Sequence, residues 1–206
     1  MREVVHLTRA DARRTPWKNG RGFTDELALW PARASFERGD FDWRIARAAV
    51  AEAGPFSAFK GFDRVLVITA GDGLVLEHGK HAPRARVRPL EPYKFSGDWP
   101  TSAGLSGGGV DDFNVLTRRG RFAAEVQVVK LGRRRMREPL DSAHAFVHVL
   151  RGGANVRITG EEQPFELQPG ESVLATELEA RDELDTAGKS DDALALLVRI
   201  VTAPRR

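Results

Sequence analysis

Short apolar runs and one clearly alternating run dominate the hydrophobic pattern of the chain, and they predict strands. Between residues 122 and 128, Phe122, Ala124, Val126 and Val128 alternate with Ala123, Glu125 and Gln127. Residues of one parity share one face of a strand, so this pattern indicates a half-buried strand. Further apolar, β-branched runs predict strands at 65–69, 74–76, 145–150, 155–159, 172–176 and 193–201.

Helical periodicity is nearly absent. One helical turn is expected near residues 8–13, with Thr8 as its cap, and a second is expected to begin at Asp111 or Asp112. The pattern as a whole predicts an all-β protein.

Two segments also follow the same order of strand, glycine turn, strand and proline. The first turns at Gly71 and reaches Pro92, and the second turns at Gly152 and reaches Pro169. A duplicated double-stranded β-helix, which is a jelly-roll-like architecture, would leave such a repeat.

Composition narrows the classes of function. The 206 residues suffice to bury an ordinary core, and the chain has no cysteine. Disulfides, thiolate metal sites and a cysteine nucleophile are therefore excluded. No apolar run has the length of a signal peptide or a membrane span, so we expect a cytoplasmic protein without a membrane partner.

Charge is unevenly distributed along the chain. The formal net charge is +3, but residues 1–137 carry 25 basic and 16 acidic residues, whereas residues 138–206 carry 7 and 13. The arginine-rich runs at 118–121 and 130–137 could form a nucleic-acid patch. No helix-turn-helix, zinc-finger or stacking-aromatic pattern accompanies them, so we expect solvated or internally paired arginines and no nucleic-acid partner.

The segment Pro16-Trp17-Lys18-Asn19-Gly20-Arg21-Gly22 is the first candidate binding site. Glycines allow backbone N–H groups to approach a ligand closely. Lys18 and Asn19 supply a cation and an amide, and Trp17 supplies an apolar wall. We assign Trp17, Lys18, Asn19 and Gly20 to ligand binding, with a surface turn beside a core tryptophan as the alternative.

Arg44 is the second candidate. On a strand it shares one parity with Asp42, Ala46, Ala48 and Val50, so it would look into a barrel mouth beside small side chains. There it could hold a carboxylate by two parallel hydrogen bonds. The alternative is an ion pair with Asp42 or another surface partner.

Arg64 and Asn114 complete the set of candidate ligand-binding residues. Each has a local alternative. Asp63 and Arg64 could build an internal hydrogen-bond network ahead of a buried strand, and Asp112 and Asn114 could cap a backbone turn.

The five histidines do not form a metal-binding pattern. His78 and His81 are expected on a loop. His144 and His148 would be about 13 Å apart on a strand, and His148 is expected to be a hydrogen-bonded core residue. We therefore assign no metal, no cofactor and no catalytic residue, since no nucleophile motif is present either.

Five motifs in order resemble those of the HutD/Ves family of the cupin superfamily. They are the segment at 16–22, Phe41-Asp42-Trp43-Arg44-Ile45-Ala46, Gly54-Pro55-Phe56-Ser57 with Gly61-Phe62-Asp63-Arg64, Phe95-Ser96-Gly97-Asp98 and Asp111-Asp112-Phe113-Asn114-Val115. The resemblance covers roughly residues 15–119. Arg21 stands where the family usually has a third glycine, and Ala46 stands where a serine is common.

The resemblance, together with the internal repeat, implies two cupin barrels, residues 1–132 and 133–206, linked near residues 133–142. It implies a metal-free protein that binds a small anionic metabolite such as formylglutamate or urocanate and has an accessory or regulatory role in histidine utilisation. The binding pocket is expected in the first half, and a homodimer is left open. The alternative is a metal-free isomerase in which Tyr93 or His148 transfers a proton.

Overall fold

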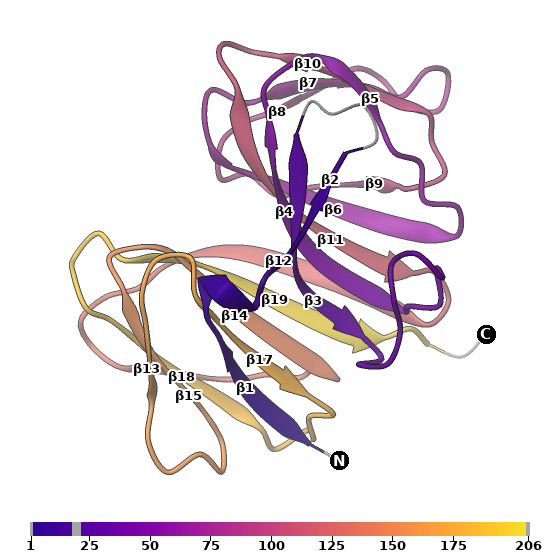
Figure 1. The fold of residues 1–206 in the computed structure, drawn as a ribbon. Coiled ribbons are helices and arrows are strands. Elements are labelled where there is room, and N and C mark those ends of the chain that lie inside the picture. The colour runs from indigo at the N-terminus through magenta and orange to yellow at the C-terminus, as the bar shows by residue number, and fades with distance from the viewer. Residues whose placement is uncertain (1, 18–21, 205–206) are drawn as a thin grey trace. The chain divides into compact units, whose positions relative to one another are not determined.

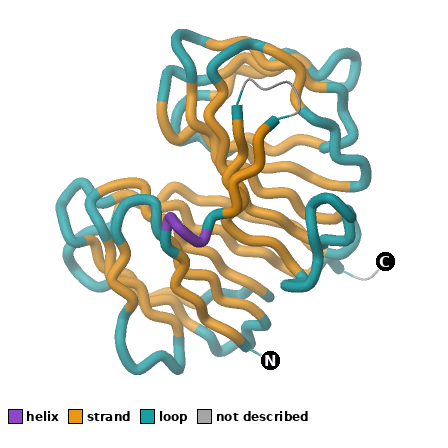
Figure 2. The backbone as a smooth tube through the Cα atoms, viewed as in Figure 1, coloured by secondary structure: helices purple, strands orange, loops and turns teal. Residues whose placement is uncertain are grey.

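Strands make up almost all of the regular structure. The computed structural model describes residues 2–17 and 22–204 (Figure 1), and within them the helical element is the 3₁₀ turn η1 (Arg9–Asp11) (Figure 2). The all-β prediction is therefore confirmed. The expected turn after Thr8 is present, and the Thr8 backbone N–H and hydroxyl both donate to the Asp11 carboxylate, at 2.8 and 2.7 Å.

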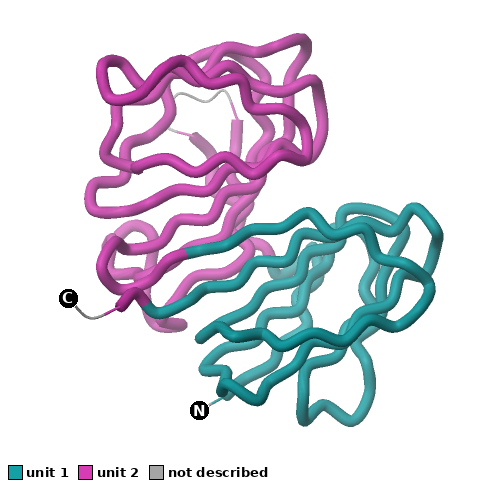
Figure 3. Tube along the Cα trace, turned by 180° about the vertical axis from the view of Figure 1, so that it is seen from behind, with its two compact units in different colours: residues 1–11, 124–202 teal, residues 12–123, 203–206 magenta. Residues whose placement is uncertain are grey.

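The chain divides into two compact units (Figure 3). Unit 1 contains residues 1–11 and 124–202, and unit 2 contains residues 12–123 and 203–206.

Unit 2 contains two antiparallel sheets. The six-stranded sheet has the order β2 (Arg13–Pro16), β3 (Phe23–Trp30), β4 (Trp43–Val50), β11 (Val110–Arg118), β6 (Phe62–Ala70), β9 (Tyr93–Ser96). The four-stranded sheet has the order β5 (Gly54–Phe56), β10 (Thr101–Leu105), β7 (Leu74–Glu77), β8 (Ala85–Val87).

Unit 1 also contains two sheets. The five-stranded sheet has the order β1 (Glu3–Leu7), β17 (Ser172–Thr176), β14 (His144–Arg151), β19 (Leu194–Thr202), β12 (Phe122–Lys130). The four-stranded sheet has the order β13 (Met136–Pro139), β18 (Glu183–Gly188), β15 (Ala154–Ile158), β16 (Phe165–Leu167).

The two units share one strand order. The run β9-β6-β11-β4 of unit 2 corresponds to β17-β14-β19-β12 of unit 1, and β5-β10-β7-β8 corresponds to β13-β18-β15-β16. Eight consecutive strands are thus repeated in sequence order, which is the structural counterpart of the repeat in the sequence. Each sheet ends in two edge strands and is not closed, so two closed barrels are not confirmed.

The core of each unit lies between its two sheets. In unit 2, Leu66 and Ile68 of β6 pack with Leu74 and Leu76 of β7. In unit 1, Val147 and Val149 of β14 belong to a core that also contains Val156 of β15. Paired residues of neighbouring strands point to the same face, so the strand register determines which other side chains look into each core.

Two sequence-based expectations differ from the structure. The units divide between Ala123 and Ala124, rather than at 132/133, and residues 1–11 join the second half because β1 pairs with β17. The helical turn expected at Asp111 or Asp112 is wrong. Both residues lie in β11, which pairs with β4 on one side and β6 on the other, and this pairing outweighs the local turn preference of aspartate.

Candidate functional site

Two buried arginines occupy the core-facing side of the six-stranded sheet in unit 2. Leu116 of β11 pairs with Arg44 of β4 and with Arg64 of β6, so the two arginines flank it in one row. Strand spacing places their backbones about 10 Å apart. Arg44 is 7 % exposed and Arg64 is 8 % exposed, and charges buried this far need partners.

The partner of Arg44 comes from the neighbouring strand β3. Arg44 Nε donates a hydrogen bond to Glu26 Oε2 at 2.6 Å, and both side chains are largely buried. Asp42, the local alternative, instead accepts from Arg121 at 2.6 Å and lies near Arg118. Arg44 is therefore an interior residue, in agreement with the parity argument from the sequence.

The partner of Arg64 is the side-chain amide of Asn114, which is also hydrogen bonded to the carboxyl group of Asp112. Arg64 donates from Nε to Asn114 Oδ1 at 2.7 Å, and Nη2 donates to the same oxygen. Asn114 Nδ2 in turn donates to Asp112 Oδ1 at 2.5 Å. Arg64 therefore belongs to an internal hydrogen-bond network, as one of the alternatives expected, but Asp63 is not part of it and pairs with Arg119. The turn-capping role expected of Asp112 and Asn114 is not found, because both residues lie within a strand.

Burial shifts the protonation equilibria of this chain of groups. It raises the pKa of Asp112 to about 6, although Arg64 and the Asn114 amide oppose the shift. Burial also lowers the pKa of Arg64 to about 10, with Asp112 opposing this shift and the Arg44 cation adding to it. Arg64 thus remains a cation at neutral pH, and Asp112 titrates close to neutrality.

Aromatic rings cover both guanidinium groups. The Arg44 Cζ atom lies 4.2 Å from the ring centre of Phe36. The Arg64 Cζ atom lies 4.6 Å from the ring centre of Phe56 and 5.5 Å from that of Phe95. These distances are in the range of cation–π attraction, so the rings hold the guanidinium planes while using none of their N–H donors.

Several donors of the two arginines have no partner within the described residues. Arg44 uses only Nε, which leaves Nη1 and Nη2, and Arg64 leaves Nη1. In the next row, Ala46 of β4 follows Arg44 on the same face and pairs with Asn114 on one side and Glu26 on the other. Two cations with unused parallel donors beside a small side chain can accept a carboxylate.

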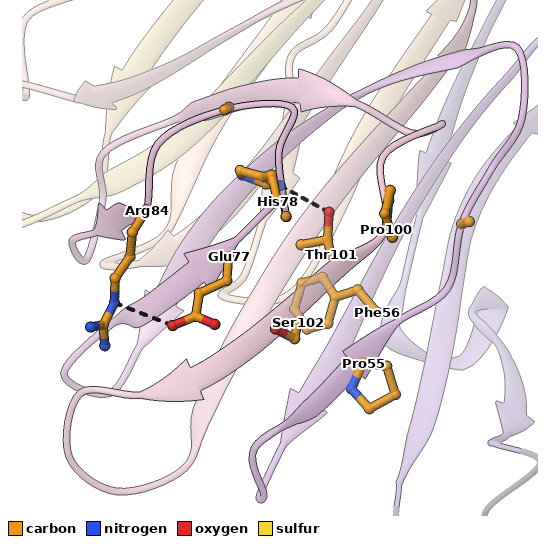
Figure 4. Close-up of a pocket in the computed structure, with 11 residues that line it drawn as sticks. Pro55, Phe56, Glu77, His78, Arg84, Pro100, Thr101 and Ser102 are labelled. Carbon is orange, nitrogen blue, oxygen red and sulfur yellow. Dashed lines mark hydrogen bonds and ion pairs between the residues drawn. The ribbon is translucent and has the colours of Figure 1, made fainter.

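An open cavity of about 670 Å³ adjoins this cluster through Phe56. The Phe56 ring that covers Arg64 also lines the cavity, together with His78, Thr101 and Ser102 (Figure 4). Glu77 and Arg84 lie together at one side, 3.6 Å apart. Phe56 therefore separates a solvent-accessible cavity from a buried cation.

His78 forms a second buried polar group in unit 2. Its Nδ1 lies 2.9 Å from Thr101 Oγ1, and its Nε2 lies 3.1 Å from Tyr93 Oη. The histidine follows β7 on a loop, as expected, but is only 1 % exposed. Burial lowers the pKa of His78 and raises that of Tyr93, so both groups are neutral at pH 7.

The sequence-predicted site residues fall into two groups. Arg44, Arg64 and Asn114 come together on one face. Trp17 follows β2, packs partly buried against the unit 2 core and donates from Nε1 to Thr24 Oγ1 at 2.9 Å. The remaining predicted residues, Lys18, Asn19 and Gly20, lie outside the described residues, as does Arg21.

The sequence did not indicate Glu26 as the partner of Arg44. It suggested only a turn-capping role for Asp112, and it did not indicate that Tyr93 contacts His78. Glu26 precedes a β-bulge between Glu26 and Ala28, which breaks the alternation that would have revealed its face. His148, the other candidate for proton transfer, lies in unit 1, where its Nδ1 is 2.8 Å from Ser172 Oγ. It is buried and hydrogen bonded, as expected for a core histidine.

The strand of unit 1 that corresponds to β6 is apolar, although Arg199 of the neighbouring strand β19 pairs with Ala145, shares its face and contacts Glu138. By strand order β14 corresponds to β6, and its core-facing side chains are Ala145, Val147 and Val149. They pack with Val173 and Ala175 of β17, which corresponds to β9. The described residues of unit 1 therefore carry no counterpart of Arg64 on this strand.

The arginine-rich runs contact carboxylates. In unit 2, Arg119 contacts Asp63 at 3.0 Å and Asp98 at 2.7 Å. In unit 1, Arg135 and Arg137 both contact Asp185, and these arginines hold the pKa of that carboxyl far below its usual range. These contacts agree with internal pairing of the basic runs.

The described residues form neither a cluster of metal-ligating side chains nor a membrane-spanning helix. Across residues 2–17 and 22–204, three or more His, Asp or Glu side chains nowhere gather in an arrangement that could hold a metal ion. The same residues contain no helix with the length and apolar character needed to cross a membrane.

Comparisons with known sequences point to one family. The model of the HutD family matches residues 9–195. An uncharacterised 21.2 kDa protein from the hutC 3′ region of Pseudomonas putida is 32% identical over 187 residues, which cover 88% of this chain and 95% of that protein. Protein Ves of Citrobacter koseri is 37% identical over 122 residues, 57% of this chain and 61% of Ves.

Solved structures show the same fold. HutD from Pseudomonas fluorescens SBW25, determined in a formate condition, has a TM-score of 0.77 at 26% identity and covers 98% of this chain and 100% of that one. A conserved protein of Pseudomonas aeruginosa PAO1 has a TM-score of 0.85 at 26% identity, covering 97% and 99%. Oxalate decarboxylase of Lactobacillus farciminis, at 9% identity and a TM-score of 0.66, covers 96% and 88% and shows likeness of the cupin-like fold alone.

Proposed function

The chain belongs to the HutD family, and from this premise we propose that unit 2 binds a small carboxylate metabolite of histidine utilisation. The single observation that carries the proposal is the pair of buried arginines, Arg44 and Arg64, whose unused guanidinium donors lie on one face. Formylglutamate and urocanate are the candidate ligands, since both are carboxylates and the family name refers to that pathway.

The charge and shape of the Arg44 and Arg64 side chains favour an anionic ligand. An arginine guanidinium matches a carboxylate in shape and charge, and each hydrogen bond to a charged group contributes about 1.5–3 kcal/mol. Phe36 and Phe56 hold the two guanidinium planes, so little side-chain entropy remains to be lost on binding. A metal ion is not required, because two cations are already present.

We assign a sensing or sequestering role rather than catalysis, with Trp17, Lys18, Asn19 and Gly20 of the 16–22 motif contributing to ligand binding. The two units are proposed to be two cupin barrels, close to the predicted halves 1–132 and 133–206. The first would hold the ligand. The second would be mainly structural, which its apolar core-facing strand β14 supports.

The test is calorimetric titration with N-formyl-L-glutamate and with urocanate. Arg44→Lys keeps a cation for Glu26 but loses the planar pair of donors, so binding should weaken about tenfold or more. Arg47→Lys is the matched control, because Arg47 is the next arginine of β4 and contacts Asp25, at 3.1 Å. Equal affinity of both variants and the parent would contradict the proposed site.

A second candidate function is proton transfer by the His78–Tyr93 pair. Its support is the 3.1 Å contact between His78 Nε2 and Tyr93 Oη beside a cavity that His78 lines. Turnover of a bound metabolite that is lost in Tyr93→Phe but kept in His148→Gln would favour this candidate. Saturable binding without turnover would favour the sensing role.

A further inference from the structure

The buried face around Arg44 and Arg64 carries two positive and two negative groups. Arg44 is hydrogen bonded to Glu26, and Arg64 is connected to Asp112 through Asn114. With Asp112 ionised the charges of the four groups cancel. A bound carboxylate would then leave one uncompensated negative charge in a region where unpaired charge is costly.

Asp112 is the one carboxyl of this set without direct contact to a cation. Its side chain is 2 % exposed, and its hydrogen-bond partners are neutral groups, the Asn114 amide and the backbone of Ala48. Glu26, in contrast, contacts Arg44 directly at 2.6 Å. The carboxyl that most easily accepts a proton is therefore Asp112, and burial already raises its pKa to about 6.

Few other charged groups act on Asp112. Its row contains Ala48 of β4, Thr24 of β3 and Ile68 of β6, all uncharged, and the facing sheet adds the apolar side chains Leu74, Leu76 and Ala103. The charged groups that share its face on the neighbouring strands are Arg64 on β6, Arg44 on β4 and Glu26 on β3, and Asp111 lies beside it in the chain. Of these, Asp111 is exposed.

We infer that the site takes up a carboxylate together with one proton, and that Asp112 accepts this proton. The inference rests on the proposed function. The balance is simple: the ligand enters as its anion, one proton from solvent adds to a carboxyl oxygen of Asp112, and the buried set keeps the same net charge. Asn114 fixes the position of the Asp112 carboxyl group by donating to it, and it accepts from Arg64. The remaining donor of Arg64, Nη1, is then left for the ligand.

The coupling predicts how affinity depends on pH. A bound anion raises the pKa of Asp112 further, so between the free and bound values the complex binds more protons than the free protein, and affinity increases as pH falls. Affinity should therefore rise severalfold from pH 8 to pH 6. Below pH 6 the dependence levels off, because Asp112 is then neutral before binding.

The experiment is titration calorimetry at pH 7 with N-formyl-L-glutamate, urocanate and sodium formate, each in phosphate and in Tris. The difference in heat between the two buffers gives the number of protons taken up. The parent protein should take up between about half a proton and one proton. Asp112→Asn should take up none, and its affinity should no longer change between pH 6 and pH 8. Asp111→Asn, the exposed neighbour, is the matched control and should behave as the parent.

The possible results separate this inference from the function on which it rests. Binding with equal affinity at pH 6 and pH 8 and no proton uptake overturns the inference and leaves the binding function intact. Proton uptake that persists in Asp112→Asn overturns it as well, because another group is then the acceptor. No binding of any of the three probes overturns both. If Asp112→Asn does not fold, the buffer comparison and pH profile of the parent still decide.

Discussion

Gly22 lies against the ring of Trp17. A Cβ atom at position 22 would stand 3.0 Å from Trp17 Cε3 and Cζ3 and 3.2 Å from the carbonyl oxygen of Ala49. The backbone N–H of Trp17 also donates to the Gly22 carbonyl at 2.8 Å. Because Gly22 has no side chain, the Trp17 ring can lie against it and pack partly buried against the unit 2 core.

Replacing Gly22 by alanine should therefore destabilise the protein. The added methyl group must displace either the ring or backbone, which costs about 1–3 kcal/mol in a packed region. Denaturant unfolding followed by tryptophan fluorescence measures the loss. Gly54→Ala is the control, because no atom lies within 4 Å of a Cβ placed there. Equal stability of the two variants would show that the Trp17 contact does not constrain position 22.

Asn114→Ala should destabilise unit 2 without removing a charge. The substitution leaves Arg64 and Asp112 buried without the amide that joins them, and such unsatisfied groups cost about 1–3 kcal/mol. Asn155→Ala in unit 1 is the control, since the Asn155 side-chain oxygen is buried without a hydrogen-bond partner and has less to lose. Urea unfolding of both variants gives the comparison. A smaller loss for Asn114→Ala than for Asn155→Ala would contradict the bridging role.

Much of the fold follows from the sequence because short apolar runs mark so many of its strands. The run at 172–176 coincides with β17, and the run at 74–76 falls within β7. The same parity argument placed Arg44 on the face that carries Ala46 and Ala48, which is the core-facing side. Local pattern is sufficient here, since one face of each strand must be buried.

The site was only partly predictable because its contacts join strands that are distant in sequence. Arg64 and Asn114 are 50 residues apart and meet only through the register of β6 and β11. Glu26 is hidden by its bulge, and Asp112 has the residue type of a turn but the environment of a core. Sequence pattern indicates the face of a residue but not its cross-strand neighbour.

Lys18→Ala should weaken ligand binding and leave stability nearly unchanged. Lys18 lies outside the described residues, so the expectation rests on its glycine-flanked motif. Losing one charge-assisted hydrogen bond should cost about 1.5–3 kcal/mol, or about tenfold to hundredfold in affinity, whereas stability should change by at most about 0.5 kcal/mol. Titration and thermal melts separate the two effects. A variant that binds normally but melts much lower would make Lys18 structural.

His144 should make the protein less stable in acid. Burial lowers its pKa from 6.5 to about 4, with Glu177 opposing the shift, because the histidine is only 3 % exposed at the start of β14. The folded state therefore binds fewer protons than the unfolded state between these values, so the contribution of the neutral imidazole is complete above pH 6.5 and is lost as pH falls toward 4. The loss should reach about 3 kcal/mol.

The measurement is the free energy of unfolding of the parent and of His144→Gln at pH 7, 6, 5 and 4. Stability of the parent relative to the variant should fall across this range, since glutamine does not titrate. The comparison isolates His144 from Asp112, whose raised pKa acts in the opposite direction in both proteins. His81→Gln, at an exposed histidine, should follow the parent. A constant difference between parent and His144→Gln from pH 7 to 4 would mean that folding does not shift the pKa of His144.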